Sequence, residues 1–323
     1  MKLCVTGGAG YVGSVVTALL VRAGHDVVVI DDCSTGDAGA VDPGATLLRG
    51  SVRDTAPYVL RKGCDAVLHF AAKALVAESV RDPARYWDGN LGESLALLEA
   101  MRATRTERIV FSSTAATYGE PDRTPIVETA PTRPINPYGA SKLAVDTTLT
   151  EAARLHGIGA VSLRYFNVAG AYDGHGERHD PETHLIPNFL RVALGERDAV
   201  EIFGTDYPTA DGTCVRDYVH VVDLAVAHLR ALEVVRPGSH RIFNVGSGSG
   251  YSIREVAGVC RAVTGRPIPV RTLARRPGDP AVLVAATDRI RTELGWSPER
   301  DLTAMVTDAW EFQLSRRTPA GTR

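Results

Sequence analysis

The chain has 323 residues, which is long enough for one large domain or for two ordinary domains with a core each. Hydrophobic residues make up 44% of the chain, charged residues 23%, and the formal net charge is −2 at pH 7. This composition indicates a globular protein without the broad cationic excess that binding to a nucleic acid or an anionic membrane surface requires.

Cysteine usage and the apolar segments bear on where the protein resides. Five cysteines are widely scattered and none forms a Cys-x-x-Cys pair, which is typical of a reduced, cytoplasmic chain. Cys4 and Cys260 lie in apolar runs and are expected in the core. The start "MKLCVTGG" has too few apolar residues for a signal peptide, and no stretch approaches the ~20 apolar residues of a membrane span. We therefore expect a cytoplasmic protein with no membrane partner.

Short β-branched runs alternate with longer helical segments in the first half of the chain. The runs span residues 2–6, 26–30, 65–70, 108–113 and 160–167. They are apolar on both faces, as in the covered strands of a parallel sheet. Helical spacing of apolar residues fills 11–24, 83–104 and 140–157. The pattern predicts an α/β fold with a doubly wound parallel (Rossmann) sheet.

The composition of the sequence changes after about Asn167. Loops rich in Gly, His, Pro and Asp interrupt the helices at 170–187, 203–218 and 274–281. We expect a Rossmann domain in residues 1–166 and a smaller C-terminal α/β domain in 167–323, with part of the latter returning to the Rossmann sheet.

Three glycines, Gly7, Gly10 and Gly13, stand between the first predicted strand and the first predicted helix. Glycine permits a tight turn, lets the backbone approach a pyrophosphate and lets the helix pack closely, and the helix N-terminus attracts the anion. A glycine triplet alone also fits an ordinary turn. However, Asp31 follows Gly13 by 18 residues, near the spacing of a carboxylate that binds the adenine ribose. Because this carboxylate would repel a 2′-phosphate, NAD is favoured over NADP.

Tyr138 and Lys142 are four residues apart at the start of a predicted helix, on one face of it. A bare Tyr-x-x-x-Lys is common on surface helices. Here Ser112, Ser113 and Thr114 end a predicted strand at the carboxyl edge of the sheet, where ligands bind in such folds. A neighbouring ammonium favours the phenolate, so we expect Lys142 to lower the pKa of Tyr138.

Several longer motifs carry a resemblance to a known family. They are "VTGGAGYVGS", "HFAA", "VAESV", "FSSTAATYGE", "PYGASKL", "LRYFNVAGA", "IFGTDYPTADGTCVRDYVHV", "FNVGSG" and "RRPGDPA". With them the chain resembles, nearly end to end, the extended short-chain dehydrogenase/reductases, and most closely the UDP-glucose 4-epimerases. Ala115 and Ala116 occupy the positions where the related dehydratases carry an Asp-Glu pair, so dehydration is not expected.

The resemblance implies a mechanism and a set of partners. Tyr138 takes the proton of the sugar 4-hydroxyl with support from Lys142, Thr114 bridges the two hydroxyls, and NAD accepts the hydride of C4 and returns it to the other face. The cofactor can stay bound between turnovers. The family also implies a homodimer, formed here by the helices that contain residues 94–101 and 142–149.

The resemblance implies that residues 1–166 are the NAD-binding domain and residues 167–323 the substrate (UDP-sugar) domain, and it also assigns binding positions. Those for NAD are Gly7, Gly10, Tyr11, Val12, Gly13, Asp31, Ser51, Val52, Phe70, Ala71, Lys73, Tyr138, Lys142, Tyr165 and Phe166. Those for the UDP-sugar are Thr114, Asn167, Leu185, Phe203, Arg216, Arg276 and Asp279. The guanidinium groups suit a diphosphate because they bind it in a bidentate manner. For Arg216 the alternative is a structural ion pair with Asp217 or Asp223.

Some positions depart from the family pattern. Ser51 replaces an aspartate that commonly meets the adenine, and Gly89 and Gly92 stand where side-chain amides are expected. Glycine in a helix costs ~1 kcal/mol relative to alanine, so we expect a looser helix and weaker retention of NAD. Leu283 falls at the position over the sugar 2-substituent, and its medium size leaves open whether N-acetylated sugars are accepted.

Other functions remain open. They are epimerisation of another UDP-sugar (N-acetylglucosamine, N-acetylgalactosamine or a uronic acid), a sugar-nucleotide oxidoreductase that releases an oxidised or reduced product, and a non-catalytic dinucleotide sensor. The segment "DGHGERHD" gathers His175, Glu177, His179 and Asp180, but the spacing fits no ligand template that we can name. We therefore expect no metal.

Overall fold

The computed structural model describes residues 1–276 and 279–317. Seven parallel strands form the central sheet, in the order β12-β6-β5-β4-β1-β2-β3. Their bounds are β1 Lys2–Thr6, β2 Asp26–Asp31, β3 Thr46–Arg49, β4 Ala66–His69, β5 Arg108–Thr114, β6 Gly159–Tyr165 and β12 His240–Val245. This arrangement confirms the predicted doubly wound sheet.

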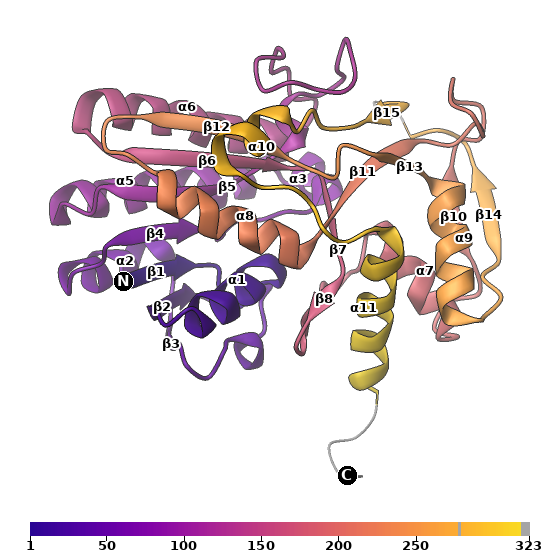
Figure 1. The fold of residues 1–323 in the computed structure, drawn as a ribbon, viewed down its shortest axis with the longest axis horizontal. Helices are drawn as coiled ribbons and strands as arrows, with labels where there is room; N and C mark the ends of the chain where they lie inside the picture. The colour runs from indigo at the N-terminus through magenta and orange to yellow at the C-terminus, as the bar shows by residue number, and fades with distance from the viewer. Residues whose placement is uncertain (277–278, 318–323) are drawn as a thin grey trace.

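Helices cover both faces of this sheet (Figure 1). On one face α1 (Tyr11–Arg22), α8 (Val221–Val234) and α10 (Asp288–Leu294) pack on a core that includes Val5, Val15 and Phe243. On the other face the covering helices are α2 (Val52–Arg61), α5 (Glu93–Thr104) and α6 (Pro137–His156). Successive residues of a strand point to opposite faces, so Cys4 belongs to the second core while Val5 belongs to the first.

Five of the seven strands coincide with the predicted runs. The two others, β3 and β12, were not recognised as separate strands. Only four residues form β3, and two of them are exposed, so the run lacks the apolar pattern of a covered strand. The edge strand β12 comes from the second half of the chain and pairs with β6. The division of domains at 166/167 stays a prediction.

The remainder of the chain builds small sheets and a third core beside the large sheet, on the right in Figure 1. Its strands are β7 Asn167–Ala169, β8 Ala171–Tyr172, β9 His175–Gly176, β10 Val200–Phe203, β11 Val215–His220, β13 Gly250–Ser252, β14 Val270–Leu273 and β15 Val282–Leu283. Its helices are α7 Leu185–Ala193, α9 Ile253–Thr264 and α11 Leu302–Ser315. Cys260 is fully buried in the third core, as predicted. The short helices α3 (Val76–Arg81) and α4 (Pro83–Tyr86) belong to the segment that precedes α5.

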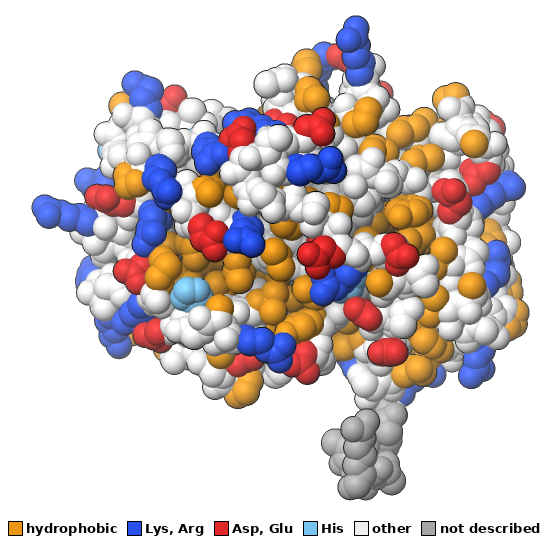
Figure 2. Space-filling view, viewed as in Figure 1, with side chains coloured by type: hydrophobic (Ala, Val, Ile, Leu, Met, Phe, Trp, Pro, Cys, Tyr) orange, Lys and Arg blue, Asp and Glu red, His pale blue; other side chains and the backbone are white. Residues whose placement is uncertain are grey.

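Charged side chains of both signs are interspersed over the face drawn in Figure 2. Among the described residues, no helix combines the length and apolar character that crossing a membrane requires.

Candidate active site

The glycine turn joins β1 to α1 and adopts a shape that side chains would block. Gly7 has a φ of +76°, and a Cβ on it would lie 2.4 Å from Ala71 N. A Cβ on Gly13 would lie 2.1 Å from Gly7 O. Gly10 caps α1 without a side-chain hydrogen bond, so the first N–H groups of the helix face a prospective anion. The turn therefore has the form of a diphosphate cradle.

Asp31 ends β2 beside this turn. Its carboxylate is 8% exposed and accepts hydrogen bonds from Ala9 N at 2.9 Å and Cys33 N at 2.8 Å. Burial raises its pKa, and these two N–H groups oppose the shift. The side chain is thus held in place at the edge of the turn, where a ribose hydroxyl would donate to it.

One large cleft runs from the glycine turn across the carboxyl edge of the sheet into the second half. Its volume of about 1320 Å³ exceeds the ~300–1,000 Å³ of an ordinary ligand pocket, so two nucleotides can share it. All of the positions predicted for NAD and for the UDP-sugar line this cleft, and so does Leu283. Pro277 and Gly278 of the "RRPGDPA" motif lie outside the described residues.

Thr114, Tyr138 and Lys142 meet at the carboxyl end of β5. Thr114 ends the strand, and its hydroxyl accepts from Ala116 N at 3.1 Å. Tyr138 and Lys142 occupy the first two turns of α6. A Cβ on Gly139 would lie 2.5 Å from Ala116 O, so glycine allows α6 to approach closely the 3₁₀ turn Ala115–Thr117 that follows β5. The sequence motif thereby becomes a compact group of a hydroxyl, a phenol and an amine.

The electrostatics of this group differ from the expectation. Burial raises the pKa of Tyr138, although the Thr114 hydroxyl beside it opposes the shift. Burial also lowers the pKa of Lys142 to about 7, and its Nζ donates to Ser112 O at 2.9 Å. The prediction that Lys142 lowers the pKa of Tyr138 is therefore wrong for the protein alone, because desolvation weakens both charged forms.

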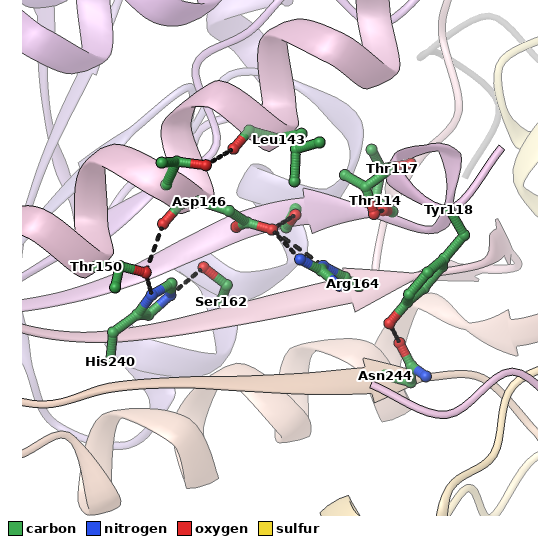
Figure 3. A network of polar contacts seen from close by, with 12 residues as sticks. Thr114, Thr117, Tyr118, Leu143, Asp146, Thr150, Ser162, Arg164, His240 and Asn244 are labelled. Carbon is green, nitrogen blue, oxygen red and sulfur yellow. Dashed lines mark hydrogen bonds and ion pairs between the residues drawn. The ribbon is translucent and has the colours of Figure 1, made fainter. Parts of the chain in front are cut away.

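A buried carboxylate, Asp146, lies one helical turn beyond Lys142 and joins three elements of the site (Figure 3). Its Oδ2 accepts from Ser113 Oγ of β5 at 3.1 Å and from Arg164 Nε of β6 at 3.0 Å. The Asp146 and Arg164 side chains are only 3% and 4% exposed. The Asp146 charge also opposes the lowered pKa of Lys142. This carboxylate thus ties α6 to the strand ends that carry Thr114.

The same network extends toward the rim of the sheet. The guanidinium of Arg164 stands 5.0 Å from the centre of the Tyr118 ring, whose hydroxyl donates to Asn244 Oδ1 at 2.7 Å (Figure 3). Sequence reasoning missed this network. Its one signal in the sequence is the four-residue spacing of Lys142 and Asp146 on one helix face.

Gly89 and Gly92 do not break the helix in which they lie. Residues Trp87–Gly92 form a π-helical segment that continues directly into α5. Asn90, which is 1% exposed, anchors it by accepting from Lys73 N at 2.7 Å and donating to Ser141 Oγ at 2.9 Å. The helix is therefore fixed by a side chain that sequence reasoning did not select. π-Helical segments of this kind are frequent at functional sites.

Ser51 serves as a helix cap. As the N-cap of α2, its hydroxyl accepts a hydrogen bond from Asp54 N at 3.1 Å. The same hydroxyl donates a hydrogen bond to Asp54 Oδ2 at 2.7 Å. Because both contacts are local, the residue fixes the start of α2 at the rim of the cleft.

The second half of the cleft presents two arginines. Arg216 forms an ion pair with Asp279, and its Nη1 donates to Val215 O at 2.9 Å. The alternative pairing with Asp217 or Asp223 is wrong. Those carboxylates are bound elsewhere: Asp217 accepts from Ser247 N and Oγ, and Asp223 pairs with Arg300.

Arg276 lies over the ring of Phe203, with 3.6 Å between its guanidinium carbon and the ring centre. Asn167 is exposed within the cleft, and Leu185 begins α7 at its edge. The cleft therefore joins an anion cradle and a proton-transfer group on one side to two guanidinium groups and an aromatic ring on the other. A cleft of this kind at the carboxyl edge of a doubly wound sheet is typical of α/β enzymes that bind a dinucleotide.

Comparison with known proteins agrees with this class. A profile of the NAD dependent epimerase/dehydratase family matches residues 3–246. The chain is 55% identical over 314 residues to the UDP-glucose 4-epimerase of Corynebacterium glutamicum, covering 97% of this chain and 95% of that protein. It is 57% identical over 319 residues to that of Streptomyces lividans, with 97% and 96% covered.

Solved structures give the same result. The UDP-glucose 4-epimerase of Brucella ovis in complex with NAD superposes with a TM-score of 0.92 at 43% identity, covering 96% of this chain and 97% of that chain. The enzyme of Bifidobacterium longum in complex with NAD⁺ and UDP gives 0.92 at 36% identity, with 98% of both chains covered. The chain belongs to the UDP-glucose 4-epimerase family.

Proposed function

We propose that this chain interconverts UDP-galactose and UDP-glucose by epimerisation at C4 of the hexose, with NAD as its cofactor. The observation that carries the proposal is the meeting of Thr114, Tyr138 and Lys142 in a cleft that also contains the glycine turn and Arg216. Relatives above 50% identity are named UDP-glucose 4-epimerases, which supports the choice of substrate over other nucleotide sugars.

The residues of the first half fit NAD. The glycine turn and the N-terminus of α1 suit the pyrophosphate, and the buried Asp31 suits the ribose hydroxyls of NAD rather than a 2′-phosphate. When bound, NAD supplies the hydride acceptor and donor for C4 together with a positive charge. The remaining assigned cofactor positions are proposed to enclose it: Val52, Phe70, Ala71, Lys73, Tyr165 and Phe166.

Proton transfer falls to the group at the end of β5. We assign Tyr138 Oη to accept and return the proton of the sugar 4-hydroxyl, and Thr114 Oγ to hydrogen-bond both hydroxyls. Since burial raises the pKa of Tyr138, its ionised form depends on positive charge in the filled cleft. Lys142 is placed for this role because Asp146 on the same helix favours its protonated form.

The second half is proposed to hold the UDP-sugar. Arg216 is fixed by Asp279 and Val215, so one planar donor group stays oriented toward a diphosphate. Arg276 and Phe203 present stacked planar groups that suit a uracil base. Asn167 and Leu185, which line the same cleft, are assigned to the sugar side. A rotation of the 4-keto sugar between these two sides would account for inversion.

A homodimer formed through α5 and α6 is part of this proposal. Leu95 of α5 is 46% exposed and Leu155 of α6 is 58% exposed, so both helices offer apolar side chains to a partner. Light scattering of the purified protein measures the mass directly, and a monomer at working concentration would contradict this part. We also propose that residues 167–323 act as the substrate domain and that the enzyme works in the cytoplasm.

The function is tested by incubating the purified protein with UDP-galactose and following the isomers by NMR. The expected result is an equilibrium mixture of UDP-galactose and UDP-glucose without net change in NADH absorbance. Net reduction of NAD would instead identify an oxidoreductase, and bound NAD without turnover would identify a sensor. The N-acetylated and uronic analogues, run in parallel, determine whether Leu283 leaves room for a larger 2-substituent.

A further inference from the structure

Three side chains with metal-binding chemistry meet in the loop between β9 and α7. Glu177, His179 and His184 each offer one ligand atom, and these atoms lie within 4.8 Å of one another. The two imidazole rings are 5.3 Å apart between centres. The loop folds back to bring in His184, whereas His175 and Asp180, which are closer in sequence, are not members of the cluster.

The cluster gathers buried negative charge without a lysine or an arginine. The side chains of Glu177 and Glu182 are only 9% and 5% exposed. Within the described part of the chain, their ion-pair partners are His179 and His184. The adjacent Arg178 forms its ion pair outside the cluster. Although burial opposes the shift, the two carboxylates raise the pKa of His184 to about 9, so a proton on this imidazole offsets part of the negative charge. A bound cation would take the place of that proton.

Two atoms at the centre of the cluster lack a hydrogen bond. Glu177 Oε1 and His179 Nδ1 are both buried and pair by charge, yet neither makes a hydrogen bond of acceptable geometry. Buried polar atoms in proteins are nearly always hydrogen-bonded, so an unbonded pair calls for an explanation. The two atoms face each other in direct contact. A metal ion shared between them would give both atoms a partner.

We propose that Glu177, His179 and His184 bind a divalent transition metal ion of the Zn²⁺ class. Two imidazoles and one carboxylate form a donor set that suits Zn²⁺, whereas Mg²⁺ and Ca²⁺ prefer oxygen ligands alone. Glu182 orients one ligand: its Oε1 contacts His184 Nδ1 at 2.8 Å and accepts from His184 N at 2.7 Å. The same nitrogen, His184 Nδ1, lies 3.5 Å from Glu177 Oε2, so Glu182 holds the ring against the cluster, as carboxylates do for histidines at other metal sites.

The position of the site indicates its effect. The three proposed ligands and Glu182 line the large cleft together with Gly10 and Tyr11. The pKa of Tyr11 is raised, mainly by burial and to a smaller extent by the charges of Glu177, Glu182 and Asp308. These carboxylates give the cleft wall here a negative electrostatic potential. A bound metal ion reduces that negative potential beside the anion cradle. It also ties the loop to the start of α7, which begins at Leu185.

The test uses the full-length, tag-free protein loaded with NAD. Calorimetric titration with ZnCl₂ is expected to show one equivalent bound, and titration with CoCl₂ is expected to give the visible absorption of a low-coordinate site. Substituting His184→Ala or Glu177→Gln removes this binding. Glu182→Gln keeps the stoichiometry but weakens the affinity about 10- to 100-fold, because only the orienting carboxylate is lost.

His156→Ala is the matched control, since His156 is exposed at the end of α6 and lies outside the cluster. It keeps the full equivalent of metal. Thermal unfolding without added metal identifies variants that do not fold. Added Zn²⁺ raises the midpoint of the wild type and of His156→Ala, raises that of Glu182→Gln only at higher concentration, and leaves those of His184→Ala and Glu177→Gln unchanged. Wild-type protein that binds no stoichiometric Zn²⁺ or Co²⁺, or metal affinity unchanged in His184→Ala or in Glu177→Gln, would overturn the proposal.

Discussion

The two sides of the cleft position their functional groups in different ways. On the sheet side, backbone elements place them: Thr114 ends a strand, Lys142 lies in the second turn of a helix, and both are nearly buried. On the other side, long side chains reach into the cleft, and Arg216 depends on a partly exposed partner, Asp279. We infer that the sheet side fixes the chemistry with little freedom, while the other side adjusts to the ligand through side chains.

The sharpest test of the sheet side is Tyr138→Phe. Losing the proton acceptor is expected to lower kcat for UDP-galactose by about 10²- to 10⁴-fold, the usual contribution of general acid–base catalysis. KM is expected to change little, since the ring remains. Tyr86→Phe is the matched control: this ring packs edge-on against Tyr138 at 6.4 Å, but its hydroxyl bonds to Leu75 O. Near-normal turnover in Tyr138→Phe would remove the assigned base.

Asp146→Asn asks whether the buried network holds the sheet side together. It leaves the buried guanidinium of Arg164 without its counter-charge, so the free energy of unfolding is expected to fall by about 3–5 kcal/mol. The exposed pair of Glu151 and Arg154 gives the control, because Glu151→Gln is expected to cost less than about 1 kcal/mol. Urea unfolding measures both. Equal effects would show that the buried network contributes no more to stability than an exposed ion pair on the same helix.

Lys142→Met tests how burial of the Lys142 amine makes the free energy of unfolding depend on pH. The pKa of Lys142 is about 7 in the folded protein and ~10.4 in an unfolded chain, so the unfolded state binds the extra proton between these values. Wild-type stability without NAD is therefore expected to rise with pH across this window. The methionine variant lacks this dependence.

The stability advantage of Lys142→Met is thus largest below pH ~7 and shrinks toward pH ~10. Urea unfolding at a series of pH values measures the difference. A difference that does not vary with pH would mean that burial leaves the charge on the amine unaffected.

Local sequence patterns predicted most of the sheet side. The apolar runs indicated five strands, and the glycine turn with Asp31 indicated the cofactor cradle, because those features depend on residues close together in the chain. The Tyr138–Lys142 spacing was equally local. In contrast, the partner of Arg216 is 63 residues away, and nothing in the local sequence favoured Asp279 over the nearer Asp217.

Two other features escaped prediction for the same reason. His184 joins Glu177 only because the loop folds back, and Asn90 matters only because Lys73 and Ser141 lie on either side of it. The pKa of Tyr138 was predicted in the wrong direction because desolvation depends on the complete fold around the phenol. Long-range packing, rather than residue type, decides these properties.

The smallest expected effect comes from the adjustable side, in Arg216→Lys. A lysine has no planar donor group and cannot contact Asp279 and Val215 O while also facing a diphosphate. KM for UDP-galactose is therefore expected to rise about tenfold, equivalent to ~1.4 kcal/mol, with kcat nearly unchanged. Arg275→Lys is the control, because Arg275 pairs with the exposed Asp206 away from the cleft lining. If kcat fell as steeply as in Tyr138→Phe, the arginine would act in the chemical step, and the division between a fixed chemical side and an adjustable binding side would fail.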